Sequence, residues 1–349
     1  MKIEKNITGQ TPEGVDVELY TLTSNDGMEV KITNIGATIT SIRTPDRNGN
    51  LGQVVLGFDD PLTYLSKEYL DCGFFFGATV GRYANRIALG KFAIDNKQYQ
   101  LEVNNGPNHL HGGTGSFNTK IWQSTQFESE SRVGVSMTYT SPNMENGYPG
   151  TLSVTVVFTL NATNELSINY QAKTDKKTIV NLTNHSYFNL AGVGNVLDTE
   201  VSFAASRYTP KDDTNIPTGD VESVKGTALD FIMPHKIGER IGYYDDGYDH
   251  NLVIDGTAGE LRQAAEAYDP RSGRTLQFLT TEPGFQFYTA YYLGGQFERE
   301  GLKFDRFGGF CFEAQHYPDS PNKPQFPSTL LKQGETYTQT TIYRFGVRK

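Results

Sequence analysis

Alternation of apolar and polar residues is the feature that most restricts the fold of this chain. It runs through residues 15–24, is interrupted by the turn sequence Asn25-Asp26-Gly27, and resumes at Met28. Residues two apart share one face of a β-strand, so the pattern predicts a hairpin with one buried face. Further strands are expected at residues 38–44, 152–160 and 165–172.

A second hairpin is predicted between residues 261–268 and 275–281, although the alanines of its first arm would also suit a helix. Asp60 followed by Pro61 predicts the start of one short helix. The chain contains 36 Gly, 20 Tyr and 21 Phe, which is typical of short strands joined by glycine turns. Since no linker or repeat divides the sequence, we predict an all-β protein. It should form one large antiparallel β-sandwich with few short helices, as a single domain over residues 1–349.

Charge and hydropathy exclude several classes of partner. The net charge is -9 and no basic run is present, so nucleic acid is not an expected partner. No stretch approaches the ~18 apolar residues of a membrane helix, and residues 1–6 lack the apolar core of a secretory signal. We therefore expect a cytoplasmic protein without a membrane partner. Cys72 and Cys311 lie far apart and fit no metal-ligand spacing, so both are expected to be small buried hydrophobes.

His185 is the first candidate for chemistry. It lies within residues 181–190, where side-chain amides and hydroxyls are mixed with apolar residues of a buried strand. Such groups can hydrogen-bond an imidazole and fix its tautomer, as is usual for a histidine that transfers protons. A single histidine in such a mixture is more often a satisfied core residue, so this segment alone leaves both interpretations open.

Two glycine-containing segments add further polar candidates. Asn85 and Arg86 offer donors for the oxygens of a polar ligand, whereas surface ion pairs are the alternative for Arg82 and, less so, for Arg86. His109 and His111 would face the same side of an extended segment, and the paired glycines that follow would let a ligand approach the backbone. A His-x-His pair also suggests a metal site, but no carboxylate at suitable spacing completes one, so no metal is predicted.

Three residues nearer the end of the sequence complete the set. Asp249 precedes a strand and could accept hydrogen bonds from sugar hydroxyls, or could equally be an ordinary turn aspartate. Gln286 is flanked by two phenylalanines that could pack against a sugar ring. Glu313 interrupts an apolar strand. Because an unpaired buried charge costs several kcal/mol, Glu313 should be paired or lie in a cleft with its pKa raised, which suits a general base.

Together these segments resemble the aldose 1-epimerases, also called galactose mutarotases. The matching pieces are GRYANRI (81–87), PNHLHGG (107–113), NLTNHSYFNL (181–190), ALDF (228–231), GYDHN (247–251), TEPGFQFYT (281–289) and CFEAQHYPDSPNKPQFPSTLLKQGETY (311–337). They occur in the order of the family and at its approximate spacing over nearly the whole chain. Several independent motifs in one order make the resemblance specific.

The resemblance implies a galactose mutarotase-like supersandwich with an open polar cleft. The cleft would bind a monosaccharide and interconvert the α and β anomers of free aldohexoses such as galactose and glucose, without cofactor or metal. By match to the family's motifs, Glu313 resembles the catalytic base and His185 the catalytic acid. The implied substrate-binding residues are Asn85, Arg86, His111, Tyr187, Asp249 and Gln286. The expected state is a monomer or a weak homodimer.

The implied chemistry fits these residue types. Opening a pyranose requires removal of the anomeric hydroxyl proton and delivery of a proton to the ring oxygen, which a carboxylate facing an imidazolium supplies. His185 is therefore expected to be protonated at rest, as its ordinary pKa of about 6.5 allows. The alternatives are a glycosidase with Asp249 facing Glu313, a hexose-6-phosphate epimerase, and a carbohydrate-binding or regulatory protein of the same fold without turnover.

Overall fold

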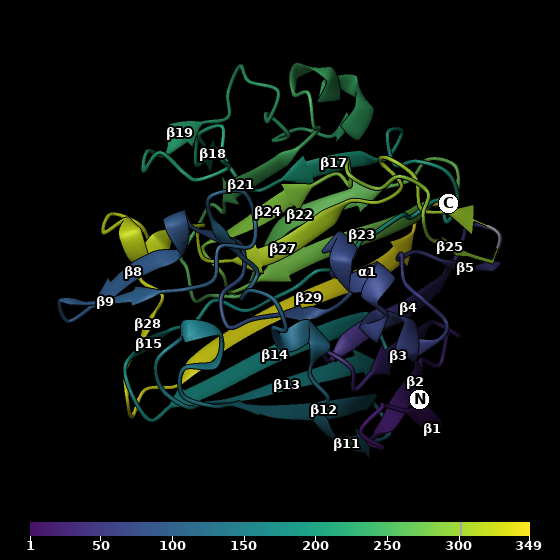
Figure 1. Cartoon of the computed structure of the whole chain (residues 1–349). Helices are drawn as coiled ribbons and strands as arrows, with labels where there is room; N and C mark the ends of the chain where they lie inside the picture. Colours follow the sequence, from purple (N-terminus) through teal and green to yellow (C-terminus); the bar gives the residue numbers. More distant parts are fainter. Residues whose placement is uncertain (301) are drawn as a thin grey trace.

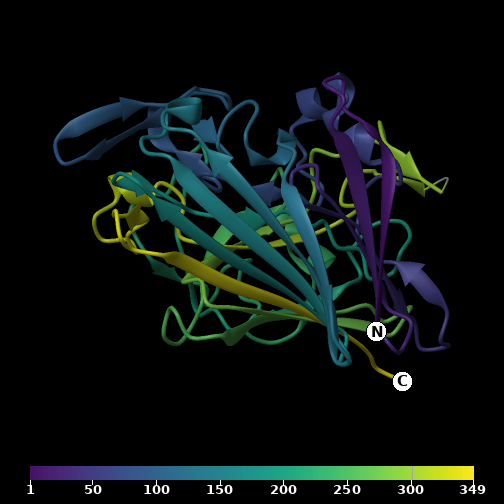
Figure 2. The ribbon, with the colours of Figure 1, turned by 90° about the horizontal axis from the view of Figure 1, so that it is seen from below.

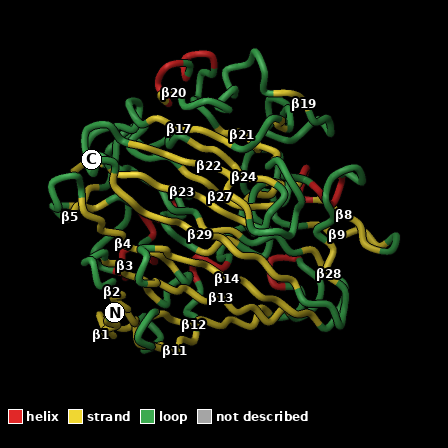
Figure 3. The backbone as a smooth tube through the Cα atoms, turned by 180° about the vertical axis from the view of Figure 1, so that it is seen from behind, coloured by secondary structure: helices red, strands yellow, loops and turns green. Residues whose placement is uncertain are grey.

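A large antiparallel sheet forms the back of the molecule in the computed structural model, which describes residues 1–300 and 302–349 (Figures 1 and 3). In spatial order its nine strands are β11 (Gln123–Glu128), β12 (Arg132–Ser141), β13 (Leu152–Asn161), β14 (Glu165–Thr174), β29 (Tyr337–Val347), β23 (Arg274–Thr280), β22 (Arg262–Tyr268), β17 (Glu200–Phe203) and β20 (His235–Lys236). The strand β29 thus joins two halves of the sheet that come from different parts of the sequence.

The period of two in the sequence accounts for these strands. In β13 every second residue from Leu152 to Leu160 is buried, and β14 has the matching pattern. The strands expected at residues 152–160 and 165–172 are therefore confirmed. The hairpin expected at residues 261–281 is confirmed as β22 and β23. The alanines of β22 do not form a helix, because Ala265 and Ala267 face the core between neighbouring strands.

The N-terminal strands form a second sheet, and in Figure 2 its purple strands stand beside the teal strands of the large sheet. They are β1 (Lys2–Gln10), β2 (Asp16–Thr23), β3 (Glu29–Thr33), β4 (Thr38–Pro45) and β5 (Leu51–Gln53). The hairpin predicted from residue 15 onward and the strand predicted at residues 38–44 are confirmed by β2, β3 and β4. The buried face of β2 packs in the same core as β12, which fixes this sheet against the large one.

A third sheet lies across the inner face of the large one (Figure 1) and positions the site. Its strands are β19 (Glu222–Ser223), β18 (Arg207–Tyr208), β21 (Asp249–Val253), β24 (Gly284–Tyr288) and β27 (Cys311–Gln315). Phe285 and Phe287 of β24 pack on Phe203 of the large sheet with ring centroids 5.3 and 5.0 Å apart, and Phe312 packs on Phe278 at 5.4 Å. This contact makes the predicted sandwich and leaves the opposite face of β21, β24 and β27 free of the core.

Short elements fill the connections. Five two-stranded pairs are β6 (Thr79–Val80) with β16 (Thr183–Asn184), β7 (Arg86–Ile87) with β10 (His109–Leu110), β8 (Lys91–Ile94) with β9 (Lys97–Gln100), β15 (Thr178–Ile179) with β28 (Leu330–Leu331), and β25 (Glu298–Arg299) with β26 (Leu302–Lys303). The only α-helix of the described residues is α1 (Lys67–Cys72), and 3₁₀ turns occur at Pro61–Leu65, Ala88–Gly90, Phe117–Thr119, Glu145–Gly147, Ile237–Glu239, Ile241–Tyr243 and Ser320–Asn322.

The helix predicted at Asp60-Pro61 is one of these 3₁₀ turns. Asp60 caps it, because its Oδ1 accepts a hydrogen bond from the backbone N–H of Leu62 at 2.9 Å. Within the described residues, no helix combines the length and the apolar character needed to span a membrane.

Candidate active site

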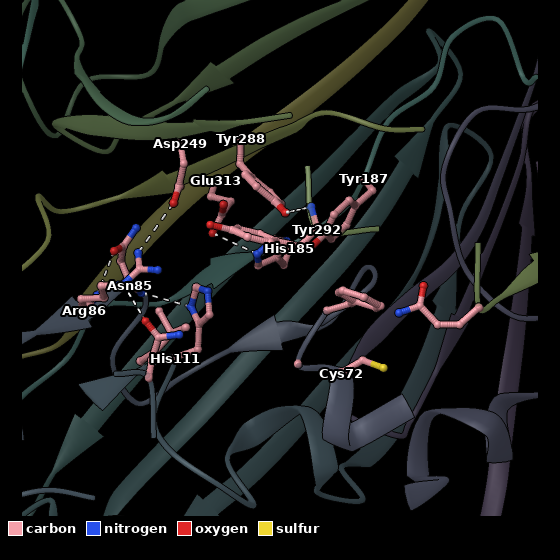
Figure 4. Close-up of a pocket in the computed structure, with 15 residues that line it drawn as sticks. Cys72, Asn85, Arg86, His111, His185, Tyr187, Asp249, Tyr288, Tyr292 and Glu313 are labelled. Atoms are coloured by element: carbon pink, nitrogen blue, oxygen red, sulfur yellow. Dashed lines mark hydrogen bonds and ion pairs between the residues drawn. The ribbon is translucent and has the colours of Figure 1, made fainter. Parts of the chain in front are cut away.

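A cavity of about 570 Å³ opens on the face of β21, β24 and β27 that points away from the core (Figure 4). Seven of the eight residues singled out from the sequence line it: Asn85, Arg86, His111, His185, Tyr187, Asp249 and Glu313. Gln286 is the exception, since it is buried in the sheet beneath the cavity. Residues from positions 72 to 313 of the chain therefore meet in one place.

Strand register builds the floor of this cavity. Asp249, Tyr288 and Cys311 lie directly opposite one another on β21, β24 and β27, and the next row on the same face is Asn251, Gln286 and Glu313. The intervening residue Phe312 points the other way, into the core. Because side chains alternate along a strand, β27 carries site residues on one face and core residues on the other.

His185 is held next to β27 by backbone hydrogen bonds around it. Phe188 and Phe310 exchange two of them, with N···O distances of 2.7 and 2.9 Å. Next to the imidazole, the N–H of His185 donates to the carbonyl of Ala78, and its carbonyl accepts from the N–H of Gly77. These contacts bring a histidine from mid-chain to 3.5 Å from Glu313, measured from Nε2 to Oε2. The imidazole also lies nearly parallel to the ring of Tyr187, with centroids 5.0 Å apart.

Burial sets the charge of this pair. Glu313 and His185 are only 2% and 4% exposed. Burial, followed by the nearby charge of Asp249, raises the pKa of Glu313 well above its ordinary value, and burial lowers the pKa of His185 to about 4. These opposite shifts favour the neutral pair, with the proton on Glu313, over the ion pair. This corrects the expectation of a resting imidazolium, although moving that proton to His185 gives the charged pair without changing the proton count.

The carboxyl group of Glu313 also lacks a partner. Among the described residues its Oε2 has no hydrogen bond, since the contact with His185 does not have hydrogen-bond geometry. A buried oxygen without a donor is costly, and a hydroxyl group of a ligand would satisfy it.

A second histidine–glutamate pair, in which Glu282 is buried and His316 is partly buried, differs from the first one. His316 lies on the other side of β27, and its Nδ1 is 2.6 Å from Oε2 of Glu282, outside the cavity. Burial disfavours the imidazolium there as well, yet the charge and hydrogen bond of Glu282 raise the pKa of His316. The side chains of that pair are hydrogen-bonded to each other, whereas His185 and Glu313 face the cavity.

His111 is held as a hydrogen-bond donor to the cavity. The backbone N–H of Asn85 donates to its Nδ1 at 3.2 Å, and burial, with the nearby His185 and Arg86, lowers its pKa well below the ordinary value. The ring is therefore neutral with its proton on Nε2. Ligand atoms of His111, His185 and Glu313 lie within 4.8 Å of one another, as a metal site would require. A metal ion on Nε2 of His111 would have to displace that proton and break the bond to Asn85, so the donor set fits a metal poorly.

The prediction that His109 and His111 face the same side is wrong. The strand ends at Leu110, and His111 has a positive φ of 51°, which turns its side chain into the cavity. His109 is buried elsewhere, with Nε2 2.6 Å from the hydroxyl of Tyr148. The expected role of the glycine pair is also corrected. A Cβ at Gly112 would lie 2.1 Å from the carbonyl oxygen of Gly81, so this glycine permits contact with the chain itself.

Asp249 fixes the direction of a chain of side-chain amides. Gln286 donates from Nε2 to Oδ1 of Asp249 at 2.6 Å, and its Oε1 accepts from Nε2 of Gln315 at 3.2 Å. Oε1 of Gln315 accepts from Asn85 at 3.5 Å, and its Nε2 also donates to Asn251 at 3.2 Å. Because a carboxylate only accepts, each amide in turn can point only one way.

The charge of Asp249 is stabilised from several sides. Burial works to raise its pKa, but the charges of Lys211 and Arg86 and the hydrogen bond from Gln286 hold the pKa below the ordinary value. Nη1 of Arg86 lies 3.8 Å from Oδ2 of Asp249 and Nε donates to Asn105 at 3.0 Å. Asp249 is thus an ionised hydrogen-bond acceptor at the cavity wall.

Two further interpretations of the sequence are wrong, one for the phenylalanines on either side of Gln286 and one for Arg82. The phenylalanines beside Gln286 cannot pack on a ligand, because both are fully buried in the core. Arg82 is buried and forms no ion pair among the described residues. Its buried guanidinium donates to Ser141 Oγ at 2.7 Å and to the carbonyl of Gly150 at 2.8 Å, which makes it a structural crosslink.

Several site residues were missed from the sequence. Tyr288, Tyr292 and Gln296 line the cavity from residues 288–296, and Cys72 lines it from the end of α1. Cys72 is only partly buried, so its expected burial is wrong, whereas Cys311 is buried as expected. The sequence did contain one signal that was not used: Cys311, Glu313 and Gln315 are spaced by two, which predicts that they share one face of a strand.

Comparison with known proteins places these features in context. The sequence profile of the family described as aldose 1-epimerase matches residues 18–344. The chain is 43% identical to a galactose mutarotase of Bos taurus over 352 residues, covering 99% of both chains, and 34% identical to an aldose 1-epimerase of Escherichia coli K12, covering 96% of both. The crystal structure of a galactose 1-epimerase from Lactobacillus acidophilus superimposes with a TM-score of 0.87 at 27% identity, covering 100% of both chains.

Proposed function

Because this chain belongs to the aldose 1-epimerase family, we propose that it interconverts the α and β anomers of free aldohexoses such as galactose and glucose. The reaction would proceed by general acid and base ring opening and use no cofactor. The observation that carries this proposal is the placement of Nε2 of His185 3.5 Å from Oε2 of Glu313 in an otherwise polar cavity. A neutral acid–base pair of this kind can give one proton while it takes another.

The reaction follows from the proton positions. Transfer of the proton from Glu313 to His185 gives a carboxylate and an imidazolium. The carboxylate then removes the proton of the anomeric hydroxyl while the imidazolium protonates the ring oxygen, and the bond between the anomeric carbon and that oxygen breaks. Rotation about the bond between the first and second carbons of the open-chain aldehyde exposes its other face. Ring closure returns both protons and gives the other anomer.

The remaining residues would hold the sugar between the acid and the base. His111 would donate its Nε2 proton and Asp249 would accept from hydroxyl groups, because the structure fixes the direction of each. Arg86 and Asn85 would donate to hydroxyl oxygens, and Tyr187 would keep the His185 ring in its plane. In this proposal Gln286 acts on Asp249 and does not touch the sugar. Fixed orientation of this kind lowers the entropic part of the barrier.

Charge at the cavity favours a free sugar over a sugar phosphate. Arg86 is the only Lys or Arg among the described lining residues, and its guanidinium already contacts Asp249. A phosphate would meet this acidic group without a free cation to pair it. The glycosidase alternative loses support because His185, and not Asp249, is the group that faces Glu313.

Wider assignments belong to the same proposal. We infer that residues 1–349 act as one domain, since the family match covers most of the chain and β29 joins both halves of the large sheet. The protein would act in the cytoplasm in galactose and hexose metabolism, as a monomer or weak homodimer, with a monosaccharide as its partner and without nucleic acid or membrane.

Polarimetry tests the function directly. Freshly dissolved α-galactose and α-glucose should change rotation faster with the protein, whereas α-glucose 6-phosphate should not respond and an aryl glycoside should release no phenol. Glu313→Gln should reduce the acceleration by about 10²-fold or more while the sugar still binds.

The matched control is Glu282→Gln, which alters the histidine–glutamate pair outside the cavity and should keep the rate per folded molecule. Sugar binding without any acceleration by the parent protein would contradict the enzyme and favour the binding protein. Full activity of Glu313→Gln would remove Glu313 from the mechanism.

A further inference from the structure

The second nitrogen of the His185 imidazole has a sulfur atom as its partner. Sγ of Cys311 lies 3.6 Å from Nδ1, and no other hydrogen bond to Nδ1 occurs among the described residues. Cys311 is fully buried, faces Tyr288 across the sheet, and stands two residues before Glu313 on the same face of β27. Side chains of one short strand, β27, therefore lie next to both nitrogens of the His185 imidazole: Cys311 at Nδ1 and Glu313 at Nε2.

The proton balance at His185 defines what this contact must do. In the proposed reaction Nε2 gains a proton from Glu313, gives one to the ring oxygen and recovers it on closure. Nδ1 has to keep its own proton throughout, since a proton lost there would leave Nε2 in the wrong tautomer for accepting from Glu313. A proton on Nδ1 that is buried requires an acceptor.

We propose that Cys311 is a positioning residue whose sulfur accepts the Nδ1–H of His185, so that all proton exchange takes place at Nε2. The inference rests on the proposed function. Burial, with Glu313 and Asp249 nearby, raises the pKa of Cys311 well above its ordinary value, so the group stays a neutral thiol. No bond to the sulfur is made or broken.

A neutral sulfur suits this position better than the carboxylate that often supports a histidine. A carboxylate would stabilise the imidazolium and make it a weaker acid. A thiol is a weak, uncharged acceptor, so it directs the ring without holding the proton on Nε2. The nearly parallel ring of Tyr187 restricts the imidazole plane, while the contact with Cys311 selects which edge faces Glu313.

Three substitutions at Cys311 separate hydrogen bonding from packing. Cys311→Ala removes the acceptor and leaves space, Cys311→Val fills the space without an acceptor, and Cys311→Ser supplies an oxygen acceptor. We expect kcat for galactose mutarotation to fall about 10-fold in the alanine and valine variants, the loss of one neutral hydrogen bond. KM should stay within about 2-fold because Cys311 does not contact the sugar. The serine variant should recover most of kcat.

The tautomer is measured without sugar. The ¹⁵N shifts of His185 should show a proton on Nδ1 in the parent and serine variants at pH 7, and a larger share of the Nε2–H tautomer in the alanine and valine variants. Circular dichroism and the Tm of each variant identify loss of folding. The proposal fails if the alanine variant keeps both the tautomer and kcat, or if valine restores kcat as well as serine does. Failure of the parent protein to accelerate mutarotation would overturn the proposed function and leave the tautomer result standing.

Discussion

Glu313 is the residue at which function and stability oppose each other. Its carboxyl group is buried, and its Oε2 lies 3.5 Å from Nε2 of His185 and has no hydrogen bond among the described residues. Such a group is useful to a reaction because a ligand can satisfy it. Without ligand it is a cost that the rest of the fold must offset.

The cost of Glu313 should appear as a pH-dependent gain in stability when the residue is replaced. Its folded pKa is raised above the unfolded value of 4.5, so its contribution is favourable below that value and is lost as pH rises through the folded pKa. Glu313→Gln has no such dependence. We expect its Tm to exceed that of the parent at pH 7–8, by roughly 2 °C for each kcal/mol of relief.

The measurement is thermal unfolding followed by circular dichroism from pH 4.5 to pH 8. The Tm difference between the two proteins should shrink toward pH 4.5, because half of the carboxyl groups are protonated there even in the unfolded chain. A difference that is constant across this range would mean that Glu313 titrates alike in the folded and unfolded states.

At the scale of elements, β27 and its neighbours set the direction of the polar groups. Gly284 lies opposite Gln315, and a Cβ there would be 3.1 Å from Oδ1 of Asn251. The missing side chain leaves room for Gln315 to reach both Gln286 and Asn251. The amide chain therefore depends on the strand register as well as on its own residues.

Substitution of Gln315 should disturb binding more than proton transfer. Gln315→Glu would place acceptors against two acceptors, whereas Gln315→Met keeps the length and removes the polarity. Each orphaned amide costs about 1–3 kcal/mol. We expect the glutamate variant to unfold at lower denaturant than the methionine variant, and both to raise KM more than they lower kcat. Equal stability of the two variants would show that the amide direction is not fixed by Asp249.

The segment before β6 holds the backbone of His185 through a hydrogen bond from Gly77. Gly77 has a φ of 65°, and a Cβ there would lie 1.9 Å from the carbonyl oxygen of Ile39. Its N–H bonds the carbonyl of His185, so Gly77→Ala should lower stability and reduce kcat by moving the imidazole. Gly194→Ala is the matched control, because Gly194 has a φ of 63° and open space around it. Gly194→Ala should lower the free energy of unfolding by only about 1 kcal/mol, the cost of a left-handed backbone conformation for alanine. The kcat of the folded protein should be unchanged. Similar kcat values in the two variants would contradict the supporting role of Gly77.

At the scale of the whole molecule, local patterns predicted strands and two hairpins, but not the pairing of strands that are distant in the sequence. The alternation in residues 15–24 and 152–160 was enough for β2 and β13, because one buried face imposes a period of two. The insertion of β29 between β14 and β23 follows from packing between distant segments, which no local period contains.

The site shows the same division between what a motif contains and what the fold adds. Residue types and motif order identified Glu313 and His185 as candidates. The positive φ of His111, the burial of Arg82 and the indirect position of Gln286 depend on contacts with distant backbone, so the sequence alone could not give them. The same holds for the charge of His185, since its pKa of about 4 results from burial.

The insertion of β29 predicts that the chain unfolds in one transition. Trp122 is the only tryptophan of the sequence and is buried. Its backbone N–H donates to the carbonyl of Asn34 where the N-terminal sheet meets the large one. Its fluorescence should therefore lose native signal at the same urea concentration as the circular dichroism of the strands. Two separate midpoints would show that the chain contains more than one folding unit.

Because β27 carries site residues on one face and core residues on the other, it limits where substitutions can alter the sugar preference of the protein. A replacement on that strand alters either the reacting groups or the phenylalanine packing behind them, so little variation is tolerable there. The entrance is different, since Tyr292 is 59% exposed, Gln296 belongs to a surface connection and Cys72 is the partly buried last residue of α1. Libraries that aim at a new sugar preference should therefore vary the entrance and leave the strand untouched.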